Sequence, residues 1–375
     1  MEKMKHILHV STPITWRGGE QQLFYLVKGS KHYKHTVLCP ENSVLAERLR
    51  QVEGVELLHF DNASFFTRWI SVQRALTWSQ FSFDMLHTHD AKAHSLALYA
   101  LMITGKKTPI IVHRRVDFAI KKNAIKSFKY THHLVGKVIS VSKAIDALVA
   151  DHLPENKRAV VYSGVEIEAM YPPSKNIRFE LGFSEDTFVI ANVAALAPHK
   201  DQKTLLKAFA LFLLTIENSK NVQLIIAGEG KSRSSVEDAI EELGLKNNVT
   251  LLGYREDVKK WLASVDVFAI SSETEGLGTS IIDAMAAKLP IVATAAGGIV
   301  ELVQPDKTGL LVPVKDVEAF SESLGKLYAS KDLRQALSES AFERAKDFSQ
   351  IKMVEGIEAV YRDVLSLDGE ANKKA

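Results

Sequence analysis

The chain of 375 residues is long for one core and suits two domains of about 150–200 residues each. With 46% hydrophobic and 25% charged residues, its composition is that of an ordinary soluble globular protein. The single cysteine, Cys39, excludes an internal disulfide framework and fits a reducing compartment. No apolar run approaches the ~18–20 residues that cross a bilayer, so we expect a cytoplasmic protein.

The net charge of +2 is unevenly distributed along the chain. Residues 1–172 hold 23 Lys and Arg against 15 Asp and Glu, whereas the remainder holds 24 against 30. Much of the basic excess lies in 106–143, where ten Lys and Arg mix with apolar and aromatic residues. This region is either a solvated helix face or a surface attracted to a phosphate-bearing lipid or the inner face of the cytoplasmic membrane. Nucleic acid is disfavoured, because the pattern matches no known nucleic-acid-binding module.

Short apolar runs alternate with helix-length segments throughout the chain. Before a polar linker around Pro172 and Pro173 these runs are 7–10, 35–39, 85–88, 109–113, 137–141 and 159–162. After the linker they are 187–193, 222–227, 249–253, 266–270, 289–293 and 310–313. Apolar strands without polar alternation are buried on both faces, which indicates parallel sheets. The pattern predicts an α/β fold with two doubly wound domains, 1–171 and 172–348.

The last predicted helix, 349–367, carries apolar residues at helical spacing, so one stripe of it must be buried. The tail 368–375 is polar, and we expect it to be disordered.

The most informative segment is 271–298, with the sequence SSETEGLGTSIIDAMAAKLPIVATAAGG. Glu275 precedes a Gly-x-Gly turn that leads into an apolar helix at Thr279, and Asp283 follows one turn later. A helix N-terminus after a glycine turn exposes backbone N–H groups and a positive dipole end, which favour phosphate. Carboxylates beside it are suited to accepting hydrogen bonds from sugar hydroxyls. The segment therefore predicts a sugar-nucleotide site.

This segment also resembles the E-x7-E motif of glycosyltransferase family 4, here as an E-x7-D variant with Glu275 and Asp283. The resemblance covers nearly the whole chain. It implies the GT-B fold, in which two Rossmann-like domains face each other across a cleft. Domain 1–171 would bind the acceptor, 172–348 would bind the nucleotide-sugar donor, and 349–367 would return to the first domain.

A Gly-Gly turn at Gly18 and Gly19 follows the first predicted strand. It can be a plain tight turn between a strand and a helix, or a place where the backbone approaches a ligand. The resemblance favours the second interpretation, because the family carries a Gly-Gly loop here that faces the donor diphosphate and the acceptor.

Three histidines end predicted strands of the first domain. His113 can be a satisfied structural residue, whereas the resemblance places a histidine at this position beneath the transferred sugar. His87 and His89 form a His-x-His pair that could bind a metal, but the sequence offers no third ligand nearby. We expect an acceptor-side or structural role for this pair and no metal or other cofactor in the protein.

The segment 192–201 corresponds to the family's Gly-Arg-Leu-x-x-x-Lys-Gly motif, whose Arg and Lys hold the donor diphosphate. Lys200 matches the lysine, but Ala195 stands at the arginine position. One of two cations that would offset the charge of the leaving group is therefore absent. The candidates to replace it are Asn192, His199, Arg114 and Arg115.

Asp283 has a second interpretation from the sequence. Ser280 and Asp283 fit a capping box, in which the carboxylate would serve the helix rather than a ligand. The resemblance instead assigns Asp283 to ribose hydroxyls and Glu275 to the sugar. It implies His113, Lys200 and Glu275 as catalytic residues. The donor-binding residues it implies are Gly18, Gly19, Asn192, Lys200, Gly253, Tyr254, Glu275, Leu277, Gly278, Thr279, Ser280 and Asp283.

The predicted function is a retaining hexosyltransferase that moves a sugar from a nucleotide sugar, UDP favoured over GDP, to a glycan or lipid-linked acceptor. The family's usual products are cell-envelope polysaccharides, such as lipopolysaccharide or capsule, and glycolipids. No Asp-x-Asp occurs in the chain, so we expect metal-independent transfer with Lys200 and helix N–H groups neutralising the diphosphate.

Two alternatives share this architecture: a GT-B-fold UDP-sugar epimerase or phosphorylase, and a non-catalytic sugar-nucleotide binding protein. A nicotinamide dehydrogenase is disfavoured because no predicted strand is followed by Gly-x-Gly-x-x-Gly. The donor sugar, the acceptor, the linkage and the oligomeric state stay open at this point.

Overall fold

The computed structural model describes residues 4–60, 64–77, 81–117, 120 and 124–373. The chain folds as two compact units, which we call unit 1 (Met1–Gly164 with Gln350–Ala375) and unit 2 (Val165–Ser349). The sequence placed these borders at 171/172 and 348/349, whereas the two units divide at 164/165 and 349/350.

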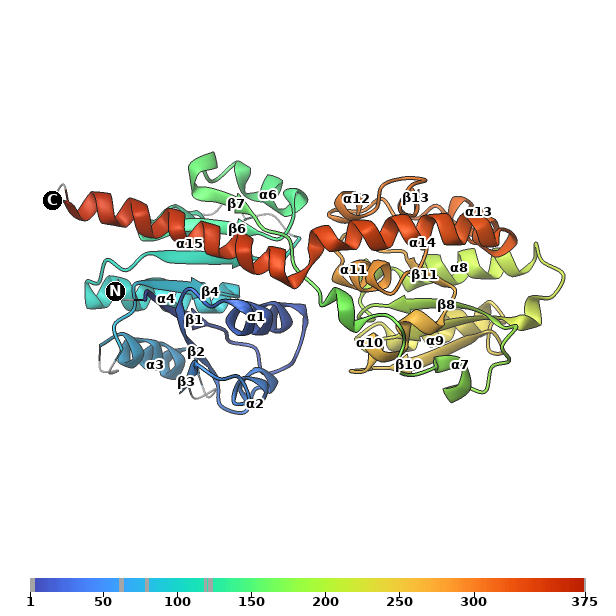
Figure 1. Cartoon of the computed structure of the whole chain (residues 1–375), viewed down its shortest axis with the longest axis horizontal. Coiled ribbons are helices and arrows are strands. Elements are labelled where there is room, and N and C mark those ends of the chain that lie inside the picture. The colour runs from blue at the N-terminus through green and yellow to red at the C-terminus, as the bar shows by residue number, and fades with distance from the viewer. Residues whose placement is uncertain (1–3, 61–63, 78–80, 118–119, 121–123, 374–375) are drawn as a thin grey trace. The chain divides into compact units, whose positions relative to one another are not determined.

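Unit 1 is built on a seven-stranded parallel sheet with the order β3-β2-β1-β4-β5-β6-β7 (Figure 1). Its strands are β1 His6–Val10, β2 Lys34–Pro40, β3 Val55–Phe60, β4 Met85–Thr88, β5 Ile110–Arg114, β6 Val135–Ser140 and β7 Arg158–Val160. Its α-helices are α1 Gly18–Gly29, α2 Val44–Leu49, α3 Phe65–Thr77, α4 Ala91–Thr104, α5 Ala124–Thr131, α6 Lys143–Ala150 and α15 Gln350–Lys373. A short 3₁₀ turn, η1 Glu155–Lys157, precedes β7.

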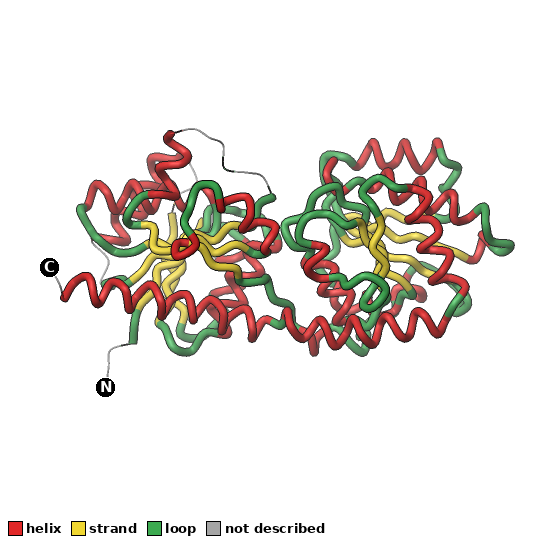
Figure 2. Tube along the Cα trace, turned by 90° about the horizontal axis from the view of Figure 1, so that it is seen from above, coloured by secondary structure: helices red, strands yellow, loops and turns green. Residues whose placement is uncertain are grey.

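Both faces of this sheet are covered by helices, as Figure 2 shows. Successive residues of a strand point to opposite faces: Leu8 belongs to a core shared with α3 and α4, and Ile7 to a core shared with α1 and α15. Both side chains have no exposed surface. This double burial explains why the strand reads as an apolar run rather than as an alternating pattern.

The strand β3 was missed by the sequence analysis. In its sequence, Val-Glu-Leu-Leu-His-Phe, the exposed residues Glu56 and His59 point to opposite faces of this edge strand, and Val55, Leu57 and Leu58 are partly exposed. The apolar run expected of a strand buried on both faces is therefore broken at this edge.

Unit 2 is built on a six-stranded parallel sheet with the order β10-β9-β8-β11-β12-β13. Its strands are β8 Phe188–Val193, β9 Val222–Ala227, β10 Val249–Gly253, β11 Val267–Ile270, β12 Ile291–Thr294 and β13 Leu310–Val312. Its α-helices are α7 Ile177–Glu180, α8 Gln202–Leu213, α9 Arg233–Glu242, α10 Val258–Trp261, α11 Thr279–Ala286, α12 Ile299–Leu302, α13 Val317–Ala329 and α14 Lys331–Ala345. The 3₁₀ turns are η2 Ile167–Ala169, η3 Pro198–Lys200, η4 Ser219–Asn221, η5 Leu262–Ser264 and η6 Lys346–Phe348. Two doubly wound parallel domains are thus confirmed.

The C-terminal helix α15 packs within unit 1, against α1 and β6 (Figure 1). Its buried stripe includes Ile357, Val360 and Tyr361. The sequence ended this helix at residue 367 and expected a disordered tail of 368–375; the structure continues it to Lys373, and 374–375 lie outside the described residues. No proline stops the helix, and extending a formed helix through polar residues costs little.

Within the described part of the chain, no helix combines the length and the apolar character needed to span a bilayer.

Candidate functional site

Several of the predicted site residues follow strands at the point where each sheet reverses its strand order. This reversal falls between β1 and β4 in unit 1 and between β8 and β11 in unit 2. Doubly wound sheets bind ligands outside the carboxyl ends of the strands at such a point. In unit 1 Gly18 and Gly19 follow β1, and in unit 2 Lys200 follows β8 and Glu275 follows β11.

Lys200 and Glu275 form an ion pair in unit 2 between the lysine Nζ and the carboxylate Oε2. The Lys200 side chain is 15% exposed and that of Glu275 is 13% exposed, so the pair is largely shielded from water. Ser272 donates its hydroxyl to the same Oε2 at 3.3 Å. Two residues that the sequence predicted as catalytic are therefore in direct contact.

The loops that carry this ion pair are tied together by serine side chains. Ser271, which has no exposed surface, donates to the carbonyl oxygens of Asp201 at 2.7 Å and Lys200 at 3.3 Å. The backbone N–H of Glu273 donates to the carbonyl of His199 at 2.8 Å. These buried hydrogen bonds fix the distance between the loop after β8 and the loop after β11. The sequence analysis assigned no role to Ser271, since its function appears only once the two strands are neighbours.

The Gly-Gly turn after β12 packs against the backbone of Glu275 and Gly276. Gly298 N–H donates to the Glu275 carbonyl at 2.9 Å. A Cβ atom on Gly297 would lie 2.1 Å from that carbonyl oxygen, and one on Gly298 would lie 2.4 Å from the Gly276 oxygen. Only glycine allows the two backbones to approach this closely.

Helix α11 begins directly after this loop. Its N-cap is Gly278, with a φ of 96° that favours glycine. Among the described residues, the N–H groups of Thr279 and Ser280 donate to no other group. Leu277 is buried, at 3% exposure, and anchors the turn. Free N–H groups at the start of a helix are suited to an anion, so the predicted role in donor binding stays a prediction that this geometry allows.

The capping-box interpretation of Asp283 is wrong. Because the N-cap is Gly278, Ser280 lies inside the first turn and not at the cap. Asp283 instead has a buried Oδ1 with no hydrogen-bond partner among the described residues. Burial raises the pKa of this carboxyl to about 6, although the nearby Lys259 works in the opposite direction.

The remaining predicted donor-binding residues differ in exposure. Asn192 has no exposed surface and donates through Nδ2 to the Ala269 carbonyl at 2.8 Å, so it joins β8 to β11. Gly253 has a φ of 68°, and Tyr254 beside it is 57% exposed. The next residue, Arg255, is held in ion pairs with Glu180 and Asp257.

In unit 1 the two predicted glycines form the first turn of α1, where Arg17 N–H donates to the Glu20 carboxylate at 3.0 Å. Arg114 is buried and donates to the Tyr130 hydroxyl at 3.1 Å. Of the four residues considered as replacements for the family arginine, Arg114 and Arg115 thus belong to unit 1, and the Asn192 side chain bonds β11. His199 is exposed and directly precedes Lys200.

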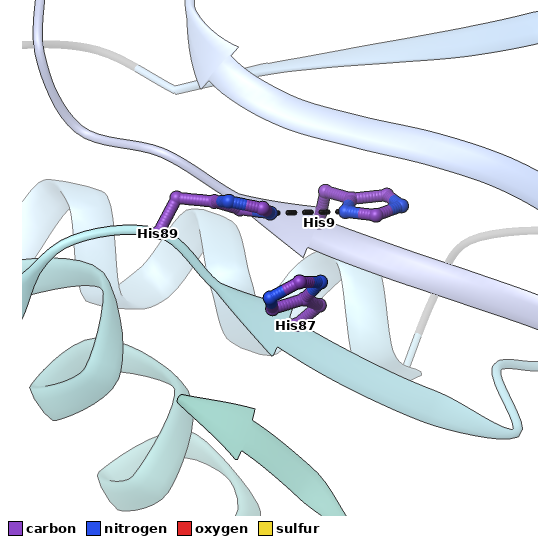
Figure 3. A group of neighbouring side chains, drawn as sticks. All are labelled: His9, His87 and His89. Atoms are coloured by element: carbon purple, nitrogen blue, oxygen red, sulfur yellow. Dashed lines mark hydrogen bonds between the residues drawn. The ribbon is translucent and has the colours of Figure 1, made fainter. Parts of the chain in front are cut away.

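Three buried histidines of unit 1 gather at the β1–β4 switch point, as Figure 3 shows: His9, His87 and His89. One ring nitrogen of each lies within 4.8 Å of the others, and His9 Nδ1 is 3.0 Å from His89 Nε2. The sequence argument that no third imidazole lies near the His-x-His pair is therefore wrong. Desolvation, the largest cause, lowers the pKa of all three rings well below the usual value, so they are neutral at pH 7.

Neutral imidazoles are the form that binds a metal, and these three are the residues that could hold one. The electrostatic surroundings oppose it. Arg115 Nη2 lies 3.3 Å from His89 Nδ1 and can only donate there, so the ring proton of His89 belongs on Nε2, the atom a metal would need. Among the described residues no carboxylate belongs to the histidine cluster, and the nearby Glu20 and Asp90 already stabilise the charge of Arg115.

Two family models match the chain over most of its length. One, described as Glycosyl transferases group 1, covers residues 173–344. The other, described as Glycosyltransferase Family 4, covers residues 16–169. The chain belongs to glycosyltransferase family 4.

Individual relatives agree with this assignment. This family 4 chain is 31% identical over 209 residues to EpsD from Bacillus subtilis (strain 168), a match that spans 55% of the chain and 54% of EpsD, about half of each. It is 24% identical to the UDP-Gal:alpha-D-GlcNAc-diphosphoundecaprenol alpha-1,3-galactosyltransferase of Escherichia coli over 76% of both chains. The crystal structure of Anabaena HepE in complex with UDP and glucose shares the fold, with a TM-score of 0.82 and 21% identity over 96% of this chain and 99% of that one.

Proposed function

We propose that this glycosyltransferase moves a sugar from a UDP-sugar to a glycan or lipid-linked acceptor, with retention of configuration and without a metal ion. The observation that carries the proposal is the shielded Lys200–Glu275 pair beside the unpartnered N–H groups at the start of α11. Support for UDP comes from the ligand named with HepE and from the donor named for the Escherichia coli relative. That relative's name also describes a lipid-linked diphosphate acceptor.

In this proposal the two residues of the ion pair bind different parts of the donor. The Lys200 ammonium and the N–H groups of Thr279 and Ser280 stabilise the negative charge that grows on the diphosphate as it leaves. Glu275, acceptor-only when ionised, takes hydrogen bonds from the sugar hydroxyls. Asp283 accepts from ribose hydroxyls.

A second cation is needed where Ala195 replaces the family arginine, and we assign it to Lys231. The loop 228–232 is bound to the loop of Ala195: Leu196 N–H donates to the Glu229 carbonyl at 3.1 Å, and Ser232 N–H donates to the Leu196 carbonyl at 3.0 Å. Lys231 is exposed and forms no ion pair with a described residue. The Lys231 side chain leaves the backbone in a loop that is hydrogen-bonded to the loop of Ala195, the position of the family arginine.

In the scheme that we propose, retention arises in one step because the acceptor hydroxyl attacks from the face that the diphosphate leaves. The bond from the anomeric carbon to the diphosphate oxygen breaks, the bond to the acceptor oxygen forms, and a leaving phosphate oxygen takes the hydroxyl proton. A dedicated protein base is unnecessary in this scheme. The positive charge that develops on the sugar ring is offset by the departing phosphate.

A lipid-linked acceptor is consistent with part of the surface of unit 1. Met102, Ile103 and Phe128 are large apolar side chains that are 44%, 65% and 43% exposed, and Lys106 and Lys107 follow α4. Fewer side chains of the basic segment 106–143 are available to a ligand than the sequence suggested, because several of them bond within unit 1, including to α15. These are Arg114, Arg115, Lys129 and Lys137. Lys121 and Lys122 lie outside the described residues.

The deciding experiment measures binding and transfer in the presence of EDTA. Thermal stabilisation by UDP- and GDP-sugars identifies the donor, and NMR of the product formed on an undecaprenyl-diphosphate sugar or a glycan acceptor gives its anomeric configuration. Transfer with retained configuration and release of UDP supports the proposal. An absolute need for a divalent cation, an inverted product, or epimerisation without an acceptor would each overturn part of it.

A further inference from the structure

Arg115 lies at the centre of the buried polar groups of unit 1. Its Nη2 lies 3.2 Å from His113 Nδ1 and 3.3 Å from His89 Nδ1, and its Nη1 donates to the His89 carbonyl at 3.1 Å. Glu20 and Asp90 stabilise its charge, so the side chain stays cationic at pH 7 although burial lowers its pKa to about 10.

The chemistry of guanidinium determines how these contacts are made. Arginine carries donors and no acceptor, so the Nδ1 atoms of His89 and His113 must both accept. A neutral imidazole carries one proton, and in both rings that proton then resides on Nε2. The tautomers of these two histidines follow from one neighbouring cation.

The same logic extends through a chain of three rings. His89 Nε2–H donates to His9 Nδ1 at 3.0 Å, and His9 Nε2–H then donates to His35 Nδ1 at 2.9 Å. Each ring accepts at Nδ1, and His89 and His9 donate from Nε2, so the chain has one direction from Arg115 to His35. A proton-bearing Nε2 on His89 also leaves no lone pair for a metal ion.

His113 occupies a separate branch. It stacks on His87, with ring centroids 5.4 Å apart and planes 5° apart, and its side chain is 5% exposed. Its Nε2 is buried and has no hydrogen-bond partner among the described residues. A buried donor without a partner costs free energy comparable to a lost hydrogen bond, so such a group in a native protein points to a ligand or water acceptor.

We propose that Arg115 is a positioning residue that holds His113 in its Nε2–H tautomer, so that His113 offers a sugar hydroxyl a hydrogen-bond donor and not a base. This inference relies on the proposed function for the identity of the acceptor, a sugar hydroxyl oxygen. The tautomer itself follows from the contacts of Arg115 alone. His113 would therefore orient the sugar and take no proton during transfer.

The direct test is long-range ¹H–¹⁵N NMR of the protein labelled at histidine, which distinguishes protonated Nδ1 from protonated Nε2. Signals are assigned with His89→Gln and His113→Gln. In the wild-type protein we expect both rings as Nε2–H tautomers, and in Arg115→Met we expect His113 to lose that preference. Arg114→Lys, the neighbouring buried arginine, is the matched control and should leave both signals in place.

An Nδ1–H signature for His113 in the wild-type protein overturns the proposal, as does an unchanged tautomer in folded Arg115→Met. If Arg115→Met does not fold, the wild-type spectrum still decides the tautomer. This readout requires no transferase activity, so it stands or falls independently of the proposed function.

A pair of substitutions tests the role of the donor at Nε2. The amide of Gln lies near the position of imidazole Nε2, whereas that of Asn lies near Nδ1. We expect His113→Gln to keep most of the transfer rate and His113→Asn to lose about tenfold or more in kcat, as for one hydrogen bond lost. Equal rates for the two variants would contradict the assignment. So would a rate of His113→Gln that rises with pH, as when hydroxide replaces a lost general base.

Discussion

Lys200 and Glu275 lie 75 residues apart in the chain and form an ion pair in which neither side chain is more than 15% exposed. Each comes from the loop after one of two adjacent strands, β8 and β11. Glu275 neutralises Lys200 before the donor binds. When the diphosphate arrives, Lys200 must either contact both groups or leave Glu275 for the phosphate. Binding and transfer should therefore respond differently to the loss of each partner.

We expect Lys200→Ala and Glu275→Ala each to lower transfer by ~10²-fold or more, the scale of one preorganised electrostatic contact. Affinity for UDP should fall in Lys200→Ala and should be kept or increased in Glu275→Ala, since the lysine is then free to pair with phosphate. Calorimetry with UDP and the double variant measures the coupling between the two side chains. Wild-type turnover in both single variants would rule out the assignment of the site.

The Gly-Gly turn should be needed for activity because it holds the Glu275 loop. In Gly298→Ala the new Cβ would lie 2.8 Å from the Leu277 Cα, so the loop must shift. We expect transfer to fall by roughly 10²-fold, as for a displacement of about 1 Å in a catalytic group. Gly325→Ala, where the nearest atom to a new Cβ is 4.0 Å away, is the control and should keep its activity. Equal behaviour of the two variants would show that the close approach is unimportant.

Lys231 should contribute to donor binding if it replaces the family arginine. We expect Lys231→Ala to weaken UDP binding by roughly tenfold, the size of one charge-assisted contact. Lys207→Ala, an exposed lysine of α8 in the same unit, should leave the affinity unchanged. The double variant with Ala195→Arg should recover binding. Calorimetry with UDP gives all four affinities, and unchanged binding in Lys231→Ala would remove this residue from the site.

Donor affinity should depend on pH through Asp283, whose pKa burial raises to about 6. The ionised carboxylate accepts stronger hydrogen bonds from ribose hydroxyls than the protonated one does. Affinity for a UDP-sugar should therefore increase between pH 5 and pH 7, a range in which the diphosphate diester does not titrate. In Asp283→Asn this pH dependence should disappear. A parallel slope in both proteins would place the titrating group elsewhere.

The buried histidines should make unit 1 unstable in mild acid. Burial lowers the pKa of His35 to about 4 and that of His94 to about 3, so both are neutral in the folded protein at pH 6. The unfolded chain binds protons at these rings below about pH 6.5. Folding stability is therefore fully present above that value and is lost as pH falls toward 4, by up to about 1.4 kcal/mol per pH unit for each ring.

Urea unfolding between pH 7.5 and 5 measures this loss. His94 packs against the ring of Tyr130 and takes no part in the hydrogen bonds around Arg115, so His94→Leu removes one titrating group without breaking that network. Its stability should decline less steeply with acid than that of the wild-type protein. Curves of equal slope would show that His94 does not contribute.

The sequence predicted the parts of the fold that depend on local composition. Strands buried on both faces, such as β8, appear as unbroken apolar runs, and the turn before α11 is marked by its glycines. The edge strand β3 was missed because exposed polar residues on both of its faces, Glu56 and His59, interrupt the apolar run. The sequence analysis wrongly treated Ser280 as the N-cap of α11. The N-cap is Gly278, two residues earlier, and the helix starts at Thr279.

Contacts across the sheets could not be predicted from composition. His9 meets His89 only because β1 lies beside β4, and their register follows from packing rather than from any local signal. The donation from Arg115 that sets the ring tautomers likewise requires a neighbour 26 residues away. The sequence predicted which types of residue lie in the candidate site, but it did not predict which residues they contact.

Unit 1 is assembled from two separated stretches of the chain, and this has a consequence during synthesis on the ribosome. Unit 2 is continuous and can complete its core before residues 350–375 emerge. Unit 1 lacks helix α15 until those 26 residues have emerged. Only then does Tyr361 reach the ring of His87, 2.6 Å from its Nδ1, and close the apolar layer over Ile7. The contact that covers His87 therefore forms last, and a messenger truncated directly after residue 349 encodes all of unit 2 but an incomplete unit 1.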